Sequence, residues 1–131
     1  MLETLFLFVR KKELIMGEQI RPARHSAMEF ARYIIDLCTN IGNSISDLKL
    51  QKVLYYIQLA FILNRKEDAF VDEMEAWPYG PVVREVYNNY SSYGSTKICL
   101  QYPNANVLMA TKKDLEKTKN ILTNHSLQVR I

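Results

Sequence analysis

Two histidines are the side chains that could act as a base near neutral pH. His25 and His125 lie near opposite ends of the chain, each beside polar residues typical of a helix end. We interpret both as solvated or capping side chains rather than as metal ligands or catalytic bases. The adjacent Ser91 and Ser92 have no base near them in the sequence, so no nucleophilic serine is predicted.

Three acidic residues, Asp72, Glu73 and Glu75, precede Trp77. Paired carboxylates can perform general acid–base catalysis. On an extended segment, however, Glu73 and Glu75 share one face while Asp72 points to the other. This favours a solvated edge whose like charges discourage strand pairing. A hydrolase that uses Glu73, Glu75 and His25 stays open as an alternative.

Motifs for metals, phosphates and disulfides are absent from the sequence. It contains no HExxH, no CxxC, no GxxxxGK[ST] and no GxGxxG. Its two cysteines, Cys38 and Cys99, have apolar neighbours, which predicts buried free thiols in a reduced, cytoplasmic setting. We therefore expect no enzyme, no catalytic residue, no cofactor and no metal.

Length and charge indicate one ordinary globular domain. The chain has 131 residues, 48% of them hydrophobic, and a formal net charge of +3. Such a small surplus does not require nucleic acid or an acidic membrane as a partner. Lysines at 112, 113, 117 and 119 are interleaved with acids and are typical of a solvated helix face. A DNA-binding regulator of its own operon remains the alternative function.

Two helices are predicted with the clearest local signals. Ser26 and Glu29 form a capping box for the first, which ends near Gly42. Ser46 begins the second, which continues to about Leu63 and is expected at the centre of the fold. The first helix carries an apolar face of Met28, Phe30, Ala31, Ile34 and Leu37. The second carries a stripe of Leu50, Val53, Leu54, Ile57 and Phe61.

The chemistry changes after this central helix. Residues 70–77 alternate partly between apolar and polar and predict a short extended segment. Pro78, Gly80 and Pro81 then define a Trp-Pro-Tyr-Gly-Pro turn, and Pro81 suits the first turn of another helix. A last helix is expected from Thr111 to about Leu122. The predicted fold class is therefore mainly α, a compact helical domain with a central amphipathic helix and a short β segment before the turn.

The N-terminal apolar run, residues 5–9, is too short to span a bilayer. An acid precedes it and basic residues follow it, which is the wrong order for a signal peptide. We expect residues 1–22 to form a loosely attached extension and residues 23–131 to form the domain.

Three motifs in order carry a family resemblance. They are SDLKLQKVLYY at residues 46–56, EAWPYGPVV at residues 75–83, and VY at 86–87 with YG at 93–94. FARYII at residues 30–35 fits the opening helix. Over residues 26–95 the chain resembles the Panacea domain of the SocA-like antitoxin family, which also covers the phage-associated proteins called GepA.

This resemblance implies a mostly helical antitoxin of bacteria, phages or mobile elements. Its partner would be a cognate protein toxin encoded beside it, and at least one member acts as an adaptor for a Clp-type protease. Family members continue past the last helix, so the domain is expected to be shortened at its C-terminus. Apolar and tyrosine residues at Val9, Tyr90 and Tyr93 permit a homodimer without requiring one.

The candidate partner-binding residues lie on the motifs. We expect Trp77, Tyr79 and Tyr87 to join the turn to the central helix, and Arg84 to pair with Glu85. Lys49 and Lys52 are expected to hold their charges at the surface, where they could meet an acidic partner. The full set of candidates is Lys49, Lys52, Trp77, Tyr79, Arg84 and Tyr87.

Overall fold

The computed structural model describes residues 20–105, and nearly half of these residues are helical. The longer helices are α2 (Ala27–Asn40) and α3 (Asp47–Arg65). A hairpin of β1 (Glu75–Trp77) and β2 (Gly80–Val82) leads into α4 (Arg84–Tyr90) and a 3-10 turn, η1 (Ser91–Tyr93). The mainly helical expectation is confirmed, whereas the N-terminal apolar run and the last predicted helix lie outside the described residues.

The predicted starts of the first two helices, α2 and α3, are confirmed. Ser26 Oγ accepts the N–H of Glu29 at 3.2 Å, and the Glu29 carboxylate accepts the N–H of Ser26 at 3.3 Å. Ser46 Oγ accepts the N–H of Lys49 at 3.3 Å and so begins α3. After α2, Gly42 adopts a φ of 77°, a left-handed conformation that favours glycine.

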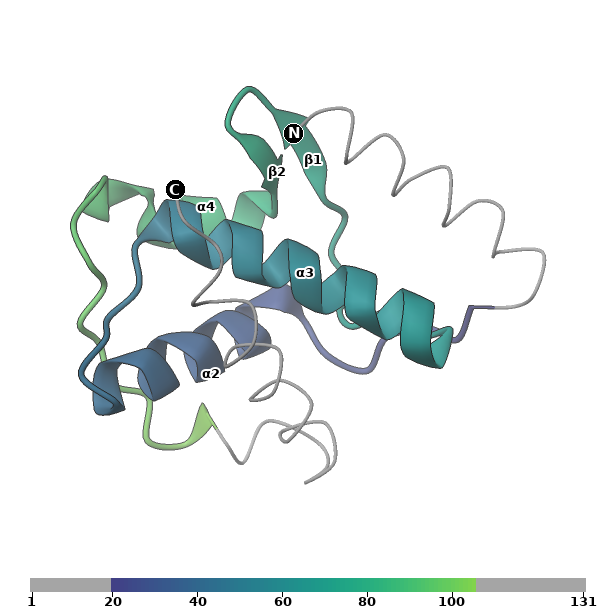
Figure 1. Ribbon diagram of the computed structural model, residues 1–131, viewed down its shortest axis with the longest axis horizontal. Helices are drawn as coiled ribbons and strands as arrows, with labels where there is room; N and C mark the ends of the chain where they lie inside the picture. The colour runs from purple at the N-terminus through teal and green to yellow at the C-terminus, as the bar shows by residue number, and fades with distance from the viewer. Residues whose placement is uncertain (1–19, 106–131) are drawn as a thin grey trace.

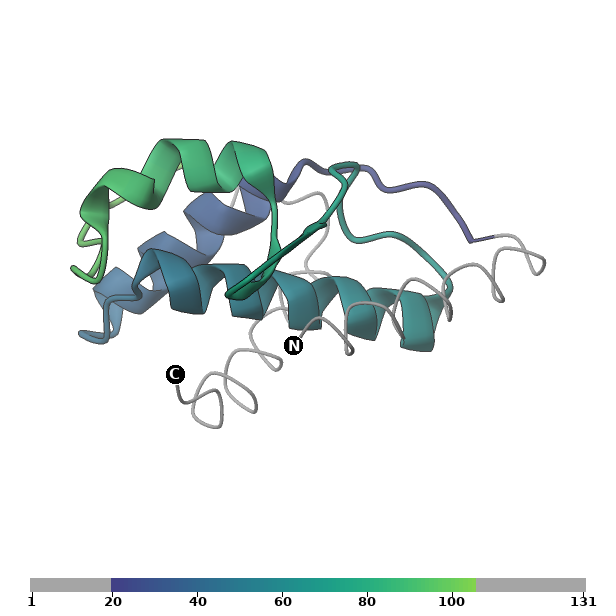
Figure 2. The same cartoon turned by 90° about the horizontal axis from the view of Figure 1, so that it is seen from above.

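The three helices pack on one another around α3. In Figure 1, α3 runs along the long axis with α2 below it and the hairpin above it. Figure 2 shows α2 and α4 on the same side of α3, in agreement with the contacts among all three helices. Because α3 meets α2, α4 and β2, it occupies the centre of the fold, as its broad apolar surface predicted.

The core forms around Phe30 of α2. Its ring is fully buried and makes edge-to-face contacts with Phe61 at 5.9 Å and Phe70 at 6.1 Å between ring centroids. The complete predicted stripe of α3 is buried beside it. The prediction for α2 was too narrow, because Tyr33 and Ile35 are buried in addition to the predicted face.

The hairpin places Pro81 in a strand. Trp77 pairs with Gly80 across the ladder, so Pro78 and Tyr79 form the turn, and Gly80 has a φ of 121° that favours glycine. The prediction that Pro81 opens the next helix was wrong. Val83 is the N-cap and α4 begins at Arg84, since Pro81 and Val82 are first buried in β2 against α3.

Isolated backbone hydrogen bonds join further extended segments at both ends of the domain. The Arg21 N–H donates to the Lys66 carbonyl at 2.8 Å, and the Val71 N–H donates to the His25 carbonyl at 3.0 Å. These bonds attach the segment before α2 to the segment after α3. At the other end, the Ile98 N–H donates to the Ile45 carbonyl at 2.8 Å.

The two cysteines have different surroundings. Cys38 is buried, as predicted, and burial raises the pKa of its thiol. Cys99 is exposed, so the prediction of a buried thiol was wrong there. Its Sγ contacts Ser44 Oγ at 3.2 Å because the neighbouring Ile98, rather than Cys99, faces the core.

Replacing Phe30 tests the position of the core. Phe30→Ala is expected to lower the free energy of unfolding by about 3–5 kcal/mol, because it removes a buried ring and leaves a cavity. Urea unfolding followed by circular dichroism measures this loss. Ile41→Ala is the control, since Ile41 is 65% exposed. Equal effects of the two substitutions would contradict this description of the core.

Candidate protein-interaction site

Two buried glutamines on α3 hold the segments that flank the hairpin. Gln51 Oε1 accepts the N–H of Val83 at 2.9 Å, and Gln58 Oε1 accepts the N–H of Ala69 at 2.6 Å. Their positions, seven apart, lie on the same side of a helix. The side-chain N–H groups of Gln51 and Gln58 donate to Asp47 and Asp68 at 3.5 and 3.1 Å. Each glutamine thus satisfies a backbone donor that packing would otherwise leave buried without a partner.

Sequence reasoning missed the role of both glutamines. Gln51 lies within the family motif at residues 46–56, and Gln58 lies outside all three motifs. The available signal was two glutamines at a helical spacing in an otherwise apolar segment. Such residues are expected to bond a neighbouring chain segment, but the sequence does not say which one.

The hairpin and α4 meet through an ion pair. Arg84 Nε donates to Glu75 Oε2 at 2.8 Å, and Arg84 Nη2 donates to Glu75 Oε1 at 2.7 Å. Trp77 Nε1 also donates to Glu75 Oε1, at 3.1 Å. This two-point geometry fixes the orientation of the guanidinium as well as its distance.

Aromatic contacts extend this ion pair. The Arg84 guanidinium carbon lies 5.6 Å from the centre of the Trp77 ring, within the range of a cation–π interaction. Trp77 in turn meets Tyr87 of α4 in a T-shaped contact, with 4.8 Å between ring centroids. We call Glu75, Trp77, Tyr79, Arg84 and Tyr87 the hairpin corner.

The hairpin corner is charged, ordered and accessible. Hydrogen bonds from Arg84 and Trp77 lower the pKa of Glu75 to about 2, so its carboxylate is ionised at neutral pH. The same hydrogen bond raises the pKa of Arg84. Tyr79, at the tip of the turn, is 71% exposed, and the Arg84 side chain is 62% exposed. A protein partner could therefore contact aromatic and guanidinium groups that are already held in place.

Several predicted roles change at this corner. Tyr79 does not join the turn to the central helix, because its side chain is in solvent at the hairpin tip. Trp77 and Tyr87 link β1 to α4, while β2 makes the contact with α3. Arg84 pairs with Glu75 rather than with Glu85, because the antiparallel hairpin brings β1 beside the start of α4.

The two predicted lysines lie on α3. Lys49 and Lys52 are both half-buried. The charge of Lys49 acts on the Cys38 thiol of α2 and lowers its pKa against the larger effect of burial. Their role as partner contacts stays a prediction.

The candidate catalytic residues have separate partners in the structure. His25 is buried, so of the two predicted roles the solvated one was wrong, and its Nδ1 lies 2.9 Å from Oε2 of Glu29 in the first turn of α2. Asp72 Oδ1 accepts the Ala27 N–H at 2.8 Å at the start of α2, whereas Glu75 binds Arg84 and Trp77. Within residues 20–105, no group of three or more histidine, cysteine or acidic side chains could hold a metal ion. None of the helices in that range is long and apolar enough to cross a membrane.

Comparison with known proteins places the motifs in a family. Residues 50–128 match the family described as Antitoxin SocA-like, Panacea domain. Antitoxin SocA of Caulobacter vibrioides (strain NA1000 / CB15N) is 30% identical over 94 residues, which cover 72% of this chain and 46% of that protein. The chain thus spans less than half the length of this curated relative. No solved structure matches the chain.

The bond from Gln51 can be tested by stability. Gln51→Leu leaves the Val83 N–H buried without a partner, so the free energy of unfolding is expected to fall by about 1–3 kcal/mol. Gln101→Leu, at an exposed position, is the control. Urea unfolding measures both variants, and an unchanged stability of Gln51→Leu would show that the bond does not hold the hairpin.

The ion pair predicts a dependence on acid. The pKa of Glu75 falls from its ordinary value of 4.5 to about 2 on folding. Its contribution to stability is therefore complete above pH 4.5 and is lost as the pH falls from 4.5 towards 2. The melting temperature of the wild type should exceed that of Glu75→Gln at neutral pH, and the gap should close over this interval. A gap that is independent of pH would contradict the assignment.

Proposed function

The chain belongs to the SocA-like antitoxin family that carries the Panacea domain, and we propose that it is an antitoxin that binds a cognate protein toxin through the hairpin corner. The observation that carries the proposal is the surface cluster in which Tyr79, Arg84 and Tyr87 are exposed beside the half-buried Trp77. Support for the antitoxin role comes from the family match and from the name of the curated relative.

The chemistry of the corner fits a protein contact. Tryptophan, tyrosine and arginine are the residue types that most often dominate the binding energy of protein interfaces. Arg84 is held by Glu75 and Trp77 before any partner arrives, so little side-chain entropy is lost on binding. Lys49 and Lys52 would add longer-range attraction to an acidic surface of the toxin.

Neutralisation could follow from this contact in two ways. In the first, the bound antitoxin covers the toxin surface that meets its target. In the second, the antitoxin delivers the toxin to a Clp-type protease, which requires the same contact and a further surface for the protease. We favour occlusion, because the hairpin corner accounts for toxin binding without a second partner.

Co-expression tests the antitoxin role. The protein encoded by the adjacent gene is expected to arrest growth when expressed alone, and co-expression of the full chain is expected to restore growth. The two proteins should also elute together in gel filtration. A lack of rescue together with a lack of complex would refute the proposal. Rescue that needs an active Clp protease would favour delivery over occlusion.

Substitution at the hairpin tip tests the contact itself. Tyr79→Ala should leave the fold intact because the side chain is 71% exposed. If Tyr79 anchors the toxin, the Kd should rise by about tenfold or more. Ile41→Ala, which also truncates an exposed apolar side chain, is the control. Calorimetry with the purified toxin measures the Kd of both variants. Equal Kd values for Tyr79→Ala and Ile41→Ala would contradict a toxin contact at the hairpin corner.

DNA binding was the alternative function, and its basis lies outside the described residues. The lysines that suggested it occupy positions 112–119. A gel-shift assay with the DNA upstream of the gene, repeated across salt concentrations, separates the two functions, because phosphate contacts produce a steep salt dependence.

A further inference from the structure

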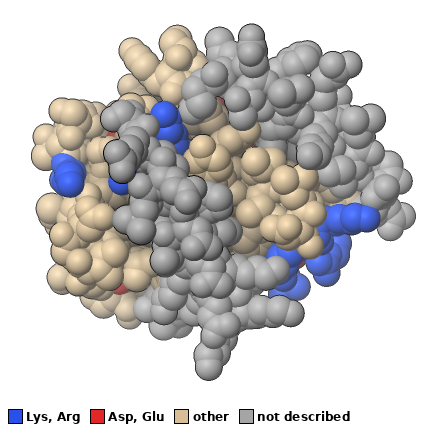
Figure 3. Space-filling view, viewed as in Figure 1, with Lys and Arg blue, Asp and Glu red and all other residues tan. Residues whose placement is uncertain are grey.

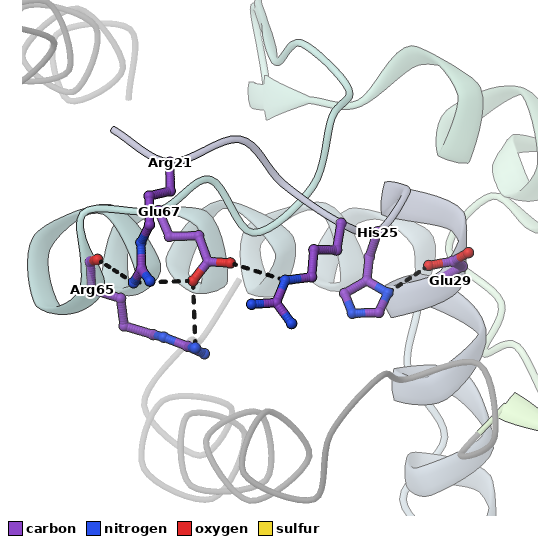
Figure 4. A network of polar contacts seen from close by, with 6 residues as sticks. Arg21, His25, Glu29, Arg65 and Glu67 are labelled. Atoms are coloured by element: carbon purple, nitrogen blue, oxygen red, sulfur yellow. Dashed lines mark hydrogen bonds and ion pairs between the residues drawn. The ribbon is translucent and has the colours of Figure 1, made fainter. Parts of the chain in front are cut away.

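A second charged cluster lies at the far end of α3 from Ser46. Figure 4 shows Glu67 beside Arg21 and Arg65. A third arginine, Arg24, also lies within ion-pair distance of Glu67. Glu67 Oε2 lies 3.5 Å from Arg21 Nη2 and 3.4 Å from Arg65 Nη2, and Glu67 Oε1 lies 4.0 Å from Arg24 Nε. We call Arg21, Arg24 and Arg65 the arginine cluster.

Within residues 20–105, Glu67 is the acid paired with both Arg21 and Arg24, and one carboxylate cannot balance two guanidinium groups. Glu67 is 6% exposed, and its Oε2 atom is buried without a hydrogen bond. Its contacts with the arginines are long, unlike the two short bonds between Arg84 and Glu75. Within residues 20–105, one carboxylate therefore faces the guanidinium groups of Arg21 and Arg24 and forms no two-point pair with either of them.

Arg21 and Arg24 place the excess positive charge at the surface. The side chains of both are 61% exposed. Arg21 is held in place because its Nη2 atom donates to the Arg65 carbonyl at 3.1 Å, at the C-terminal end of α3. The space-filling view in Figure 3 shows arginine and lysine side chains gathered over this end of α3.

We propose that Arg21 and Arg24 form a docking site for a carboxylate-rich segment of a protein partner. The cluster already surrounds one carboxylate, that of Glu67, and each guanidinium has a planar set of donors that matches a carboxylate in two-point geometry. The site is separate from the hairpin corner, which lies above the middle of α3 in Figure 1. The proposal therefore stands independently of toxin binding at that corner.

A protein segment fits this site better than nucleic acid does. Binding to a nucleic-acid backbone draws on a row of several phosphate contacts. The cluster is instead compact, with two exposed arginines beside a buried acid. A short run of aspartate or glutamate residues matches that size and charge.

Fluorescence anisotropy with a labelled octaglutamate peptide and the full chain tests the site. Arg24→Gln removes one exposed charge whose contact with Glu67 is only 4.0 Å, so the fold should be retained. Its Kd for the peptide is expected to rise about threefold, as for the loss of one exposed ion pair. Lys97→Gln removes one exposed charge at the opposite end of α3 and should leave the Kd unchanged.

A second variant has the opposite expected effect. Glu67→Gln removes the internal carboxylate that competes for the arginines, so the peptide should bind more tightly than to the wild type. Circular dichroism verifies that this variant is folded, and Arg24→Gln supplies the test if it is not. A purely structural role for the cluster predicts no gain in affinity.

The results with the variants and with DNA support or overturn the proposal as follows. Weakening by Arg24→Gln but not by Lys97→Gln or Tyr79→Ala supports the proposal. Absence of peptide binding at low salt, or equal effects of Arg24→Gln and Lys97→Gln, would overturn it. Tighter binding to a duplex DNA of equal charge, lost in Arg24→Gln, would also overturn it and assign the site to nucleic acid.

Discussion

The fold depends on how α3 satisfies the backbone of the segments packed against it. A helix that meets α2, α4 and β2 buries polar groups of its neighbours together with their apolar side chains. Gln51 and Gln58 solve this problem by accepting the N–H groups of Val83 and Ala69. Without these amides, both flanks of the hairpin would carry buried donors with no partner.

The hairpin corner follows from that constraint. Val83, whose N–H is bound by Gln51, is the N-cap of α4, and α4 begins at Arg84, directly beside the hairpin. Arg84 thereby reaches Glu75 on β1, and Trp77 and Tyr87 meet beside this ion pair. The residues proposed to contact a toxin are thus positioned by a hydrogen bond made in the core. This connection explains how a small helical domain can present a rigid surface from a short hairpin.

The hairpin corner and the arginine cluster differ in how closely an acidic side chain neutralises their arginines. Arg84 forms a two-point pair with an acid that stays ionised to low pH. Arg21 and Arg24 share one buried acid at longer distances and remain largely exposed. The first arrangement favours a fixed shape and the second an attraction to added negative charge.

The parts of the fold that depend on local signals could be predicted from the amino-acid sequence. The capping residues Ser26 and Ser46, the apolar stripe of α3 and the family motifs were all readable, because helix starts and periodicity depend on residues a few positions apart. The pairing of Arg84 with Glu75, the place of Pro81 in a strand and the position of Glu67 among arginines could not be predicted in this way. These contacts join segments separate in the chain, and a local pattern does not record which segments packing brings together.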